Sequence, residues 1–225
     1  MIKLFAAFAF AEERFLGFDT TIQPVTGDRR QFDITVHPHN DKENSRTFRT
    51  IRVISSYGAE PIRGRGARVF EAVELDRNGE PNGPHVVLKD MWIDSDRMRE
   101  GTILTSLYEA AEDEDKRLVE KHSLTTICHG DVWTEVDILD DTANALMRGF
   151  SIASGHDSHF ELPWTPYPYR LHSSHSRLRY ADKTHYRIVF KEICITIGHI
   201  RSLPDVMVVL VETVAGSFLY YTIHL

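Results

Sequence analysis

Residues 85–104, HVVLKDMWIDSDRMREGTIL, decide the fold that this sequence predicts. Their apolar run VVL ends on Lys89, and this pattern predicts a strand over His85–Asp90. The Asp and Ser side chains of Asp94–Met98 are good N-terminal caps, so a helix is predicted to begin there. The helix continues over Arg99–Val119, where apolar residues recur at helical spacing. A buried strand followed at once by a helix is therefore the centre of the predicted fold.

Two more strands and a glycine turn precede this stretch. Ile51–Ser56 and Arg68–Leu75 have the apolar pattern of strands, and Gly64-Arg65-Gly66 lies between them as a tight turn. Asn78-Gly79 and Asn82-Gly83 are both strong hairpin signals, and they connect the second strand to the third. The predicted order is strand, glycine turn, strand, hairpin, strand, helix.

The remaining segments add strands and helices on both sides of this unit. Residues 150–184 are rich in His, Ser, Pro and Tyr, which predicts a long insertion. Strands are predicted over Gln31–Val36, Leu124–Cys128 and His185–Cys194, and helices over Asp140–Arg148 and Leu203–Ala215.

Composition narrows the class of protein and its partners. The 225 residues carry a formal net charge of −7, which argues against a nucleic-acid partner, because such a surface needs Lys and Arg to displace counterions. Only Cys128 and Cys194 are present, which favours a reducing compartment. An intracellular location, cytoplasmic or nuclear, is therefore expected.

Both ends of the chain are apolar. The first 11 residues mimic a signal peptide, but their apolar run is short, so a buried helix with Phe5, Phe8 and Phe15 on one face is the favoured interpretation. Val206–Leu225 has the length and hydropathy of a membrane span, although Glu212 would be costly there. The sequence favours a buried core helix over a span.

Lys89 and Glu100 are the first candidates for a chemical role. A lysine at the end of a strand can neutralise phosphates, and an acid is needed to hold its flexible side chain in place. Gly64 and Gly66 fit a hairpin lid whose backbone N–H groups approach anions. The alternative is an ordinary hairpin turn beside solvated charges.

The histidines offer a second candidate. His156 and His159, and likewise His172 and His175, have spacings that could hold a transition metal. The residues around them are typical of a loop, and no cysteine or regular helix organises them. No metal site is predicted.

Taken together, these motifs resemble those of the fungal-type protein kinase family. The glycine turn resembles a glycine-rich loop, VVLK resembles the Val-Ala-Ile-Lys strand, and the helix of Glu100 resembles helix αC. The other segments that resemble the family are Gly17–Ile22, Lys89–Trp92, Arg97–Gly101, His129–Val132, Met147–Gly149, His185–Glu192 and Arg201–Val206. The resemblance implies an α+β fold, a protein-kinase-like N-terminal lobe with a twisted antiparallel sheet of about five strands and one main helix.

The resemblance also implies an ATP site. Lys89 would contact the α- and β-phosphates, and Glu100 would pair with Lys89. The other nucleotide contacts implied are Gly64 and Gly66 over the phosphates, Val69 and Ala72 above the base, and Phe190, Lys191 and Glu192 at the hinge.

The motifs of phosphoryl transfer do not occur in the sequence. A kinase needs His-Arg-Asp followed by Asn, and Asp-Phe-Gly to hold Mg²⁺. His129-Gly130-Asp131 is similar only in part. No catalytic residue is assigned, Mg²⁺ is expected only in the intact family, and this chain alone is predicted to be inactive.

The domain organisation expected from the resemblance has three parts. Residues 1–50 extend the kinase-like domain, 51–200 form the small lobe with its insertion, and 201–225 begin a large lobe that is otherwise missing. The family activity would be ATP-dependent phosphorylation of Ser/Thr in a protein substrate. The alternative is a non-catalytic, pseudokinase-like module that binds a protein partner.

Overall fold

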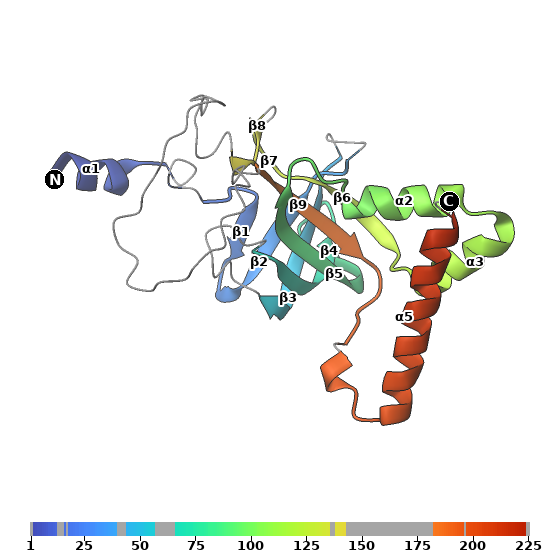
Figure 1. The fold of residues 1–225 in the computed structure, drawn as a ribbon. Coiled ribbons are helices and arrows are strands. Elements are labelled where there is room, and N and C mark those ends of the chain that lie inside the picture. Colours follow the sequence, from blue (N-terminus) through green and yellow to red (C-terminus); the bar gives the residue numbers. More distant parts are fainter. Residues whose placement is uncertain are drawn as a thin grey trace, which may run out of the picture.

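A large antiparallel sheet forms the centre of the molecule (Figure 1). The computed structural model describes residues 2–12, 16, 18–39, 44–56, 66–135, 138–142, 182–195 and 197–223. Within them, seven strands pair in the order β1-β2-β3-β4-β5-β9-β6. These strands are β1 (Ile22–Val25), β2 (Asp28–Val36), β3 (Arg46–Ser56), β4 (Arg68–Leu75), β5 (Pro81–Asp94), β6 (Thr126–Asp131) and β9 (Lys183–Phe190).

Few helices accompany the sheet, so the coarse α+β prediction is correct. The helices of the described residues are α1 (Ile2–Phe10), α2 (Glu100–Ala110), α3 (Asp113–His122), the short 3-10 helix η2 (Ile197–His199) and α5 (Leu203–Ile223). Strands β7 (Trp133–Glu135) and β8 (Ile138–Leu139) form a separate pair. Helices α2, α3 and α5 gather on one side of the sheet, and α1 lies on the other (Figure 1). The expected sheet of about five strands is larger because β1 and β2 extend it beyond β3.

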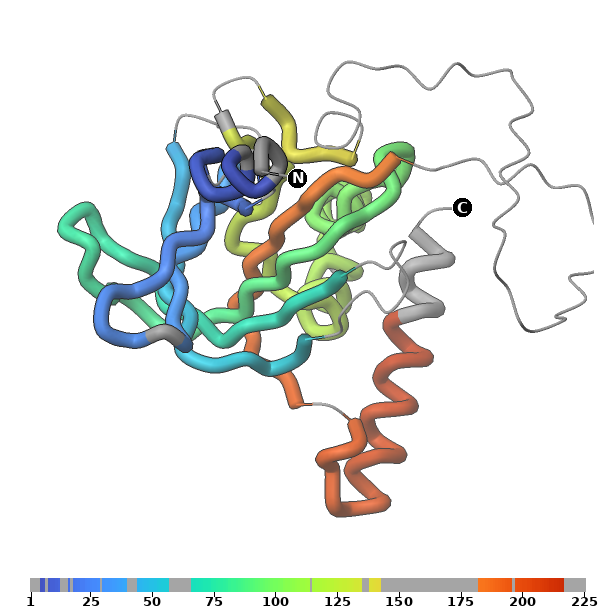
Figure 2. Tube along the Cα trace, turned by 90° about the vertical axis from the view of Figure 1, so that its left-hand side faces the viewer, coloured from blue at the N-terminus to red at the C-terminus, as the bar shows by residue number. Residues whose placement is uncertain are grey.

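The sheet curls until the end of β2 reaches β6. The backbone N–H of His39 donates to the carbonyl of His129 at 2.8 Å. The approach is so close that a Cβ built on Gly130 would lie 1.9 Å from the carbonyl oxygen of His37. Figure 2 shows the strands running side by side in this curved wall. Only a glycine allows these two backbone segments to meet.

The two faces of the sheet carry two separate apolar cores, because alternate residues of a strand point to opposite faces. The inner core consists of Ile34, Val36, Phe48, Phe70, Ala72, Val86, Leu88, Cys128 and Val189. The outer core consists of Val87, Met91, Tyr186, Ile188 and Phe190. Val69 of β4 and Leu104 of α2 pack against it. Lys89 follows Leu88 in β5 and therefore points to the outer face, toward α2.

One of the two predicted hairpin signals makes the turn between β4 and β5. The Asp76 carboxylate accepts hydrogen bonds from the backbone N–H groups of Asn78 (2.8 Å) and Glu80 (3.0 Å), and Gly79 has a positive φ of 80°. Asn82-Gly83 lies inside β5 instead, so the second signal is not a turn.

The predicted helix start is wrong. Asp94 is the last residue of β5, and α2 begins at Glu100 with Arg99 as its N-cap residue. Contacts with the distant end of β9 explain the difference: Lys183 Nζ lies 2.7 Å from the Asp94 carboxylate, and the Ser95 N–H donates to the carbonyl of Asp182. The helix also ends at Ala110, and α3 starts after a short break, so two helices stand where one was predicted.

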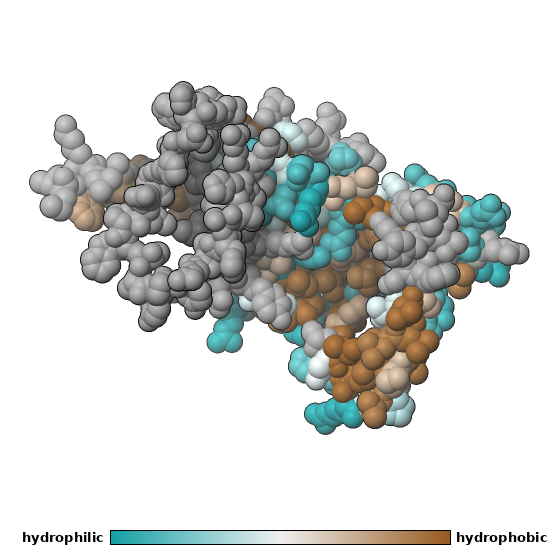
Figure 3. All heavy atoms as spheres, viewed as in Figure 1, coloured by the Kyte–Doolittle hydropathy of each residue, from teal (hydrophilic) through white to brown (hydrophobic). Residues whose placement is uncertain are grey.

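Both terminal helices are present but exposed, which corrects their predicted burial. Phe5, Phe8 and Phe10 of α1 are exposed, and α5 exposes most of its apolar side chains. Figure 3 shows these apolar side chains of α5 as one patch on the surface. Among the described helices, none combines the length and the apolar character that crossing a membrane requires.

Several predicted segments lie outside the described residues. They are Phe15, the helix of Asp140–Arg148 beyond Thr142, and nearly all of the insertion near 150–184 with its histidine pairs. The final predicted strand is shorter than expected, because β9 ends at Phe190 rather than Cys194. The three-part domain division stays a prediction.

Candidate functional site

Lys89 and Glu100 form an ion pair between the sheet and α2. Lys89 Nζ donates to Glu100 Oε2 at 2.7 Å. The two side chains are 29% and 39% exposed, so the pair is open to solvent on one side. An accessible ammonium held by a carboxylate can bind an anionic ligand such as a phosphate.

Three contacts hold the first turn of α2 beside this ion pair. The Arg99 guanidinium donates two hydrogen bonds to the Asp131 carboxylate of β6, at 2.8 and 3.0 Å. The Gly101 backbone N–H donates to the Tyr186 hydroxyl of β9 at 2.9 Å. A Cβ built on Gly101 would lie 2.1 Å from the His129 ring, so α2 approaches β6 as closely as a glycine allows.

The apolar residues proposed above the base divide between the two faces. Val69 pairs with Lys89 across β4 and β5 and packs on the outer core. Ala72 is fully buried in the inner core, so it lies on the opposite face from Lys89 and cannot share a site with it. Val87, two residues before Lys89, occupies the outer face instead. Strand alternation from Lys89 is the signal that would have identified it.

The three positions predicted for the hinge lie at the last residue of β9 and directly after it. Phe190 is buried in the outer core, next to Val87 on the neighbouring strand. The Lys191 N–H donates to the carbonyl of Thr125 at 3.0 Å, and the Glu192 carboxylate accepts from the Thr125 N–H at 2.8 Å. Burial acts to raise the pKa of Glu192, but its hydrogen bonds with Thr125 outweigh burial and lower it.

The glycine turn is described only in part, because Gly64 lies outside the described residues. Gly66 has a positive φ of 49°, a conformation that glycine adopts without strain. A Cβ there would be 3.7 Å from Cδ1 of Trp92 on β5, which is ordinary contact. Gly66 is therefore suited to a turn just before β4, beside Trp92 of β5.

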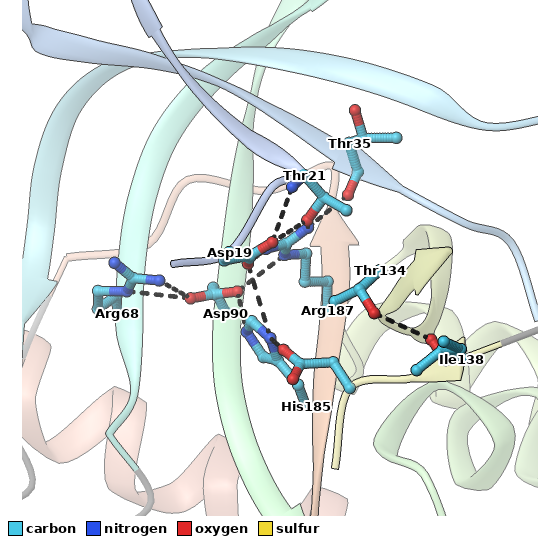
Figure 4. Close-up of polar contacts among 10 residues, drawn as sticks. Asp19, Thr21, Thr35, Arg68, Asp90, Thr134, Ile138, His185 and Arg187 are labelled. Atoms are coloured by element: carbon cyan, nitrogen blue, oxygen red, sulfur yellow. Dashed lines mark hydrogen bonds and ion pairs between the residues drawn. The ribbon is translucent and has the colours of Figure 1, made fainter. Parts of the chain in front are cut away.

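A buried ion network that sequence reasoning missed lies at the end of the inner face (Figure 4). Arg187 is fully buried and donates to the carboxylates of Asp90 (2.8 Å) and Asp19, to Thr21 Oγ1 (2.6 Å) and to the carbonyl of Thr35 (2.6 Å). Arg187 therefore connects β9, β5, β2 and the segment before β1.

His185 lies between two carboxylates of the same network. Its Nδ1 is 2.7 Å from Asp140 Oδ2, and its Nε2 is 2.7 Å from Asp90 Oδ1. Both ring nitrogens can donate only in the protonated imidazolium, so this geometry favours the charged form. Burial acts to lower the pKa of His185, but the hydrogen bonds that the ring donates to Asp140 and Asp90 outweigh it and raise the pKa. Trp92 stacks on the His185 ring, with centroids 4.8 Å apart.

The cations of the network set the charge of its acids. Burial acts to raise the pKa of Asp90, but His185, Arg187 and Arg68 reverse this effect and hold it far below its usual range. Ligand atoms of Asp19, Asp140 and His185 lie within 4.8 Å of one another, close enough for a shared cation. Each of these side chains already has a hydrogen-bond partner, and Arg187 supplies the positive charge. The cluster is accounted for as an ion network of the fold.

The network predicts a particular pH dependence of stability. The pKa of His185 is raised in the folded chain. Its contribution to the free energy of unfolding is therefore fully present below the pKa of 6.5 in the unfolded chain, and it is lost as the pH rises through the pKa in the folded chain. Lowered pKa values for Asp90 and Asp19 mean that their contribution is present above 3.8 and is lost as the pH falls. We expect the urea midpoint to decrease as the pH rises above 6.5.

The His185→Gln variant isolates this contribution from those of the other histidines. The difference between the two midpoints should be largest at acidic pH and should decrease toward alkaline pH. A difference that does not change with pH would contradict a charged His185.

A lysine on a sheet strand, ion-paired with a glutamate on the following helix, is the arrangement that protein kinases use. A family model described as fungal protein kinase matches residues 1–223. The chain therefore belongs to the fungal protein kinase family. Comparisons with curated proteins and with solved structures give no match.

Proposed function

We propose that β3, β4, β5, α2, β6 and β9 form the small lobe of a kinase fold and that its outer face binds ATP. The order of the elements supports this assignment: β3, a turn containing Gly66, β4, then β5 with Lys89, and α2 with Glu100. The observation that carries the proposal is the 2.7 Å ion pair between Lys89 and Glu100. Family membership supports it independently.

The residues of the outer face have separate roles in the proposed site. Lys89 neutralises the α- and β-phosphates, and Glu100 fixes the position of its ammonium group. Gly66 and Gly64 cover the phosphates, and Val69 and Val87 lie against the base. The adenine edge meets the backbone after Phe190, at Lys191 and Glu192.

Phosphoryl transfer is not part of the proposal for these 225 residues alone. Stabilisation of the transferred phosphate depends largely on Mg²⁺ held by acids of the catalytic loop and of Asp-Phe-Gly, and the sequence contains neither motif. His129-Gly130-Asp131 lies in β6, where Asp131 is occupied by Arg99. Binding without transfer is therefore the proposed activity of this chain.

ATP should raise the unfolding temperature of the chain, and Lys89→Ala should abolish the increase. A ligand that binds only the folded state at about 100 times its dissociation constant adds roughly 2.7 kcal/mol of stability. The measurement is thermal unfolding with increasing ATP, with and without Mg²⁺.

Lys183→Ala is the matched control for this experiment. Lys183 also forms a 2.7 Å ion pair in the same sheet, with Asp94, but that pair involves none of the proposed ATP contacts. The control should lose some stability and keep the ATP response. An ATP response that survives in Lys89→Ala would contradict the proposed site.

A non-catalytic interaction module is the second candidate function. The observation that favours it is the exposed apolar surface of α5, which includes Leu203, Met207, Val208, Val211 and Val214. Large exposed apolar patches mark surfaces that bind partners. A folded chain that gives no response to ATP would favour this candidate over the nucleotide site.

A further inference from the structure

We infer that Asp131 and Tyr186 are positioning residues that hold helix α2 so that Glu100 meets Lys89. This inference rests on the proposed nucleotide site, because the Lys89–Glu100 pair is its central contact. Neither residue lies in the pair itself. They act from two adjacent strands, β6 and β9, on the residues that flank Glu100 in the chain.

The contact before Glu100 is made by a side chain. Arg99 and Asp131 are only 14% and 18% exposed, and their two parallel hydrogen bonds fix the orientation of the guanidinium. Arg99 also donates to the carbonyl of Arg97 at 2.8 Å, which ties the turn before the helix to the same group. Because Arg99 is the N-cap residue, its attachment to β6 determines where the helix starts.

The contact after Glu100 is made by the backbone. The first N–H groups of a helix have no partner inside the helix, and they need one from elsewhere. Arg99 provides no side-chain cap, and the Tyr186 hydroxyl accepts the Gly101 N–H from β9 instead. The ring of His129 fills the space beside Gly101, so the helix cannot come closer to β6.

Glu100 lies between these two held residues, and its side chain meets Lys89. Its neighbours on both sides are held by contacts to β6 and β9, while Glu100 itself is 39% exposed. An exposed ion pair such as Lys89–Glu100 contributes little stability, so the pair alone does not fix the orientation of α2. The contacts of Arg99 and Gly101, together with the packing of Leu104 on the outer core, orient the helix, and Lys89 gains a fixed partner as the result.

ATP titrations of the full chain can test this role through a double-mutant cycle. Asp131→Asn and Tyr186→Phe are each made alone and together with Glu100→Gln. If positioning reduces the fraction of chains that are competent to bind, Asp131→Asn should weaken ATP binding about tenfold, since apparent affinity scales with that fraction. In the Glu100→Gln background the same change should have an effect of at most about twofold, because the group being positioned is gone.

Arg97→Gln is the matched control. It removes a neighbouring ion pair with Asp94 (3.1 Å) in the turn before α2, and the Arg97 side chain is 58% exposed. ATP affinity should be unchanged. If Asp131→Asn does not fold, Tyr186→Phe still tests the inference, because it removes a single hydroxyl group and should also weaken binding only when Glu100 is present.

The outcomes separate this inference from the proposed function. Equal losses of affinity in both backgrounds, or no loss in either, would overturn the positioning role while leaving ATP binding in place. If the unaltered chain binds no ATP, the proposed function fails, and hydrogen exchange of the amides of Gly101–Thr105 decides the inference instead. Faster exchange in Asp131→Asn than in Arg97→Gln would support it, and equal exchange would overturn it.

Discussion

Replacing Arg187 by Met should lower the free energy of unfolding by about 3–5 kcal/mol, because the change removes a buried cation that Asp90 and Asp19 share. Arg187 is fully buried, and Asp90 is almost fully buried beside it. Methionine fills similar space without charge, so the loss measures missing electrostatic compensation more than missing volume. The contacts to Thr21 and Thr35 are lost as well, which leaves the segment before β1 attached to β2 through the hydrogen bond from the Thr35 N–H to the Thr21 carbonyl.

Urea unfolding of Arg187→Met and Arg68→Met gives the comparison. Arg68 donates to the same Asp90 carboxylate at 2.6 and 3.0 Å, but its side chain is 43% exposed. Its removal should cost only about 1 kcal/mol or less, since water replaces an exposed guanidinium. Equal losses in the free energy of unfolding of the two variants would mean that the burial of Arg187 does not determine how much it stabilises the fold.

Replacing Gly130 by Ala should cost about 3 kcal/mol or more, at the upper end of the range for overpacking. The added methyl group would lie 1.9 Å from the carbonyl oxygen of His37 and 3.1 Å from the N–H nitrogen of His39. These are backbone atoms at the junction of β2 and β6, so neither can rotate away as a side chain would. Relief requires the two segments to separate, and the hydrogen bond from His39 to His129 would break.

Gly198→Ala is the control for the intrinsic effect of the substitution. Gly198 lies in η2, and a Cβ there meets nothing within 4 Å. Its urea midpoint should change little or increase slightly, because alanine restricts the unfolded chain. A midpoint for Gly130→Ala close to that of the control would show that the junction between β2 and β6 opens easily.

Local sequence patterns predicted the centre of the sheet well. The bounds of β4, Arg68–Leu75, match the prediction, because this strand is a short apolar run with a hairpin signal directly after it. The predicted helix start at Asp94 is wrong, because this good capping residue pairs instead with Lys183 of β9. Capping propensity depends on neighbouring residues only, so it cannot predict a contact between residues that are 89 positions apart.

The candidate site was predictable where the chain itself sets the spacing. Lys89 and Glu100 lie on consecutive elements, so the order of strand and helix was enough to bring them together. Ala72 lies three residues after Val69, so strand alternation places the two side chains on opposite faces, and only Val69 shares the outer face with Lys89. The ion network of Asp19, Asp90, His185 and Arg187 could not be found in this way, because its members come from segments that only the strand order makes neighbours.

The contact between Thr142 and Lys183 has a consequence for the length of chain that can join these two residues. The Lys183 N–H donates to Thr142 Oγ1 at 2.9 Å, although the two residues are 41 positions apart in the sequence. An isolated bridge between Asp141 and Thr184 joins the same two points. The entropy of closing a loop grows only slowly with its length, so the sheet places little constraint on how much sequence is inserted there. A longer or shorter segment between Thr142 and Lys183 should therefore leave the register of β5, β9 and β6 unchanged.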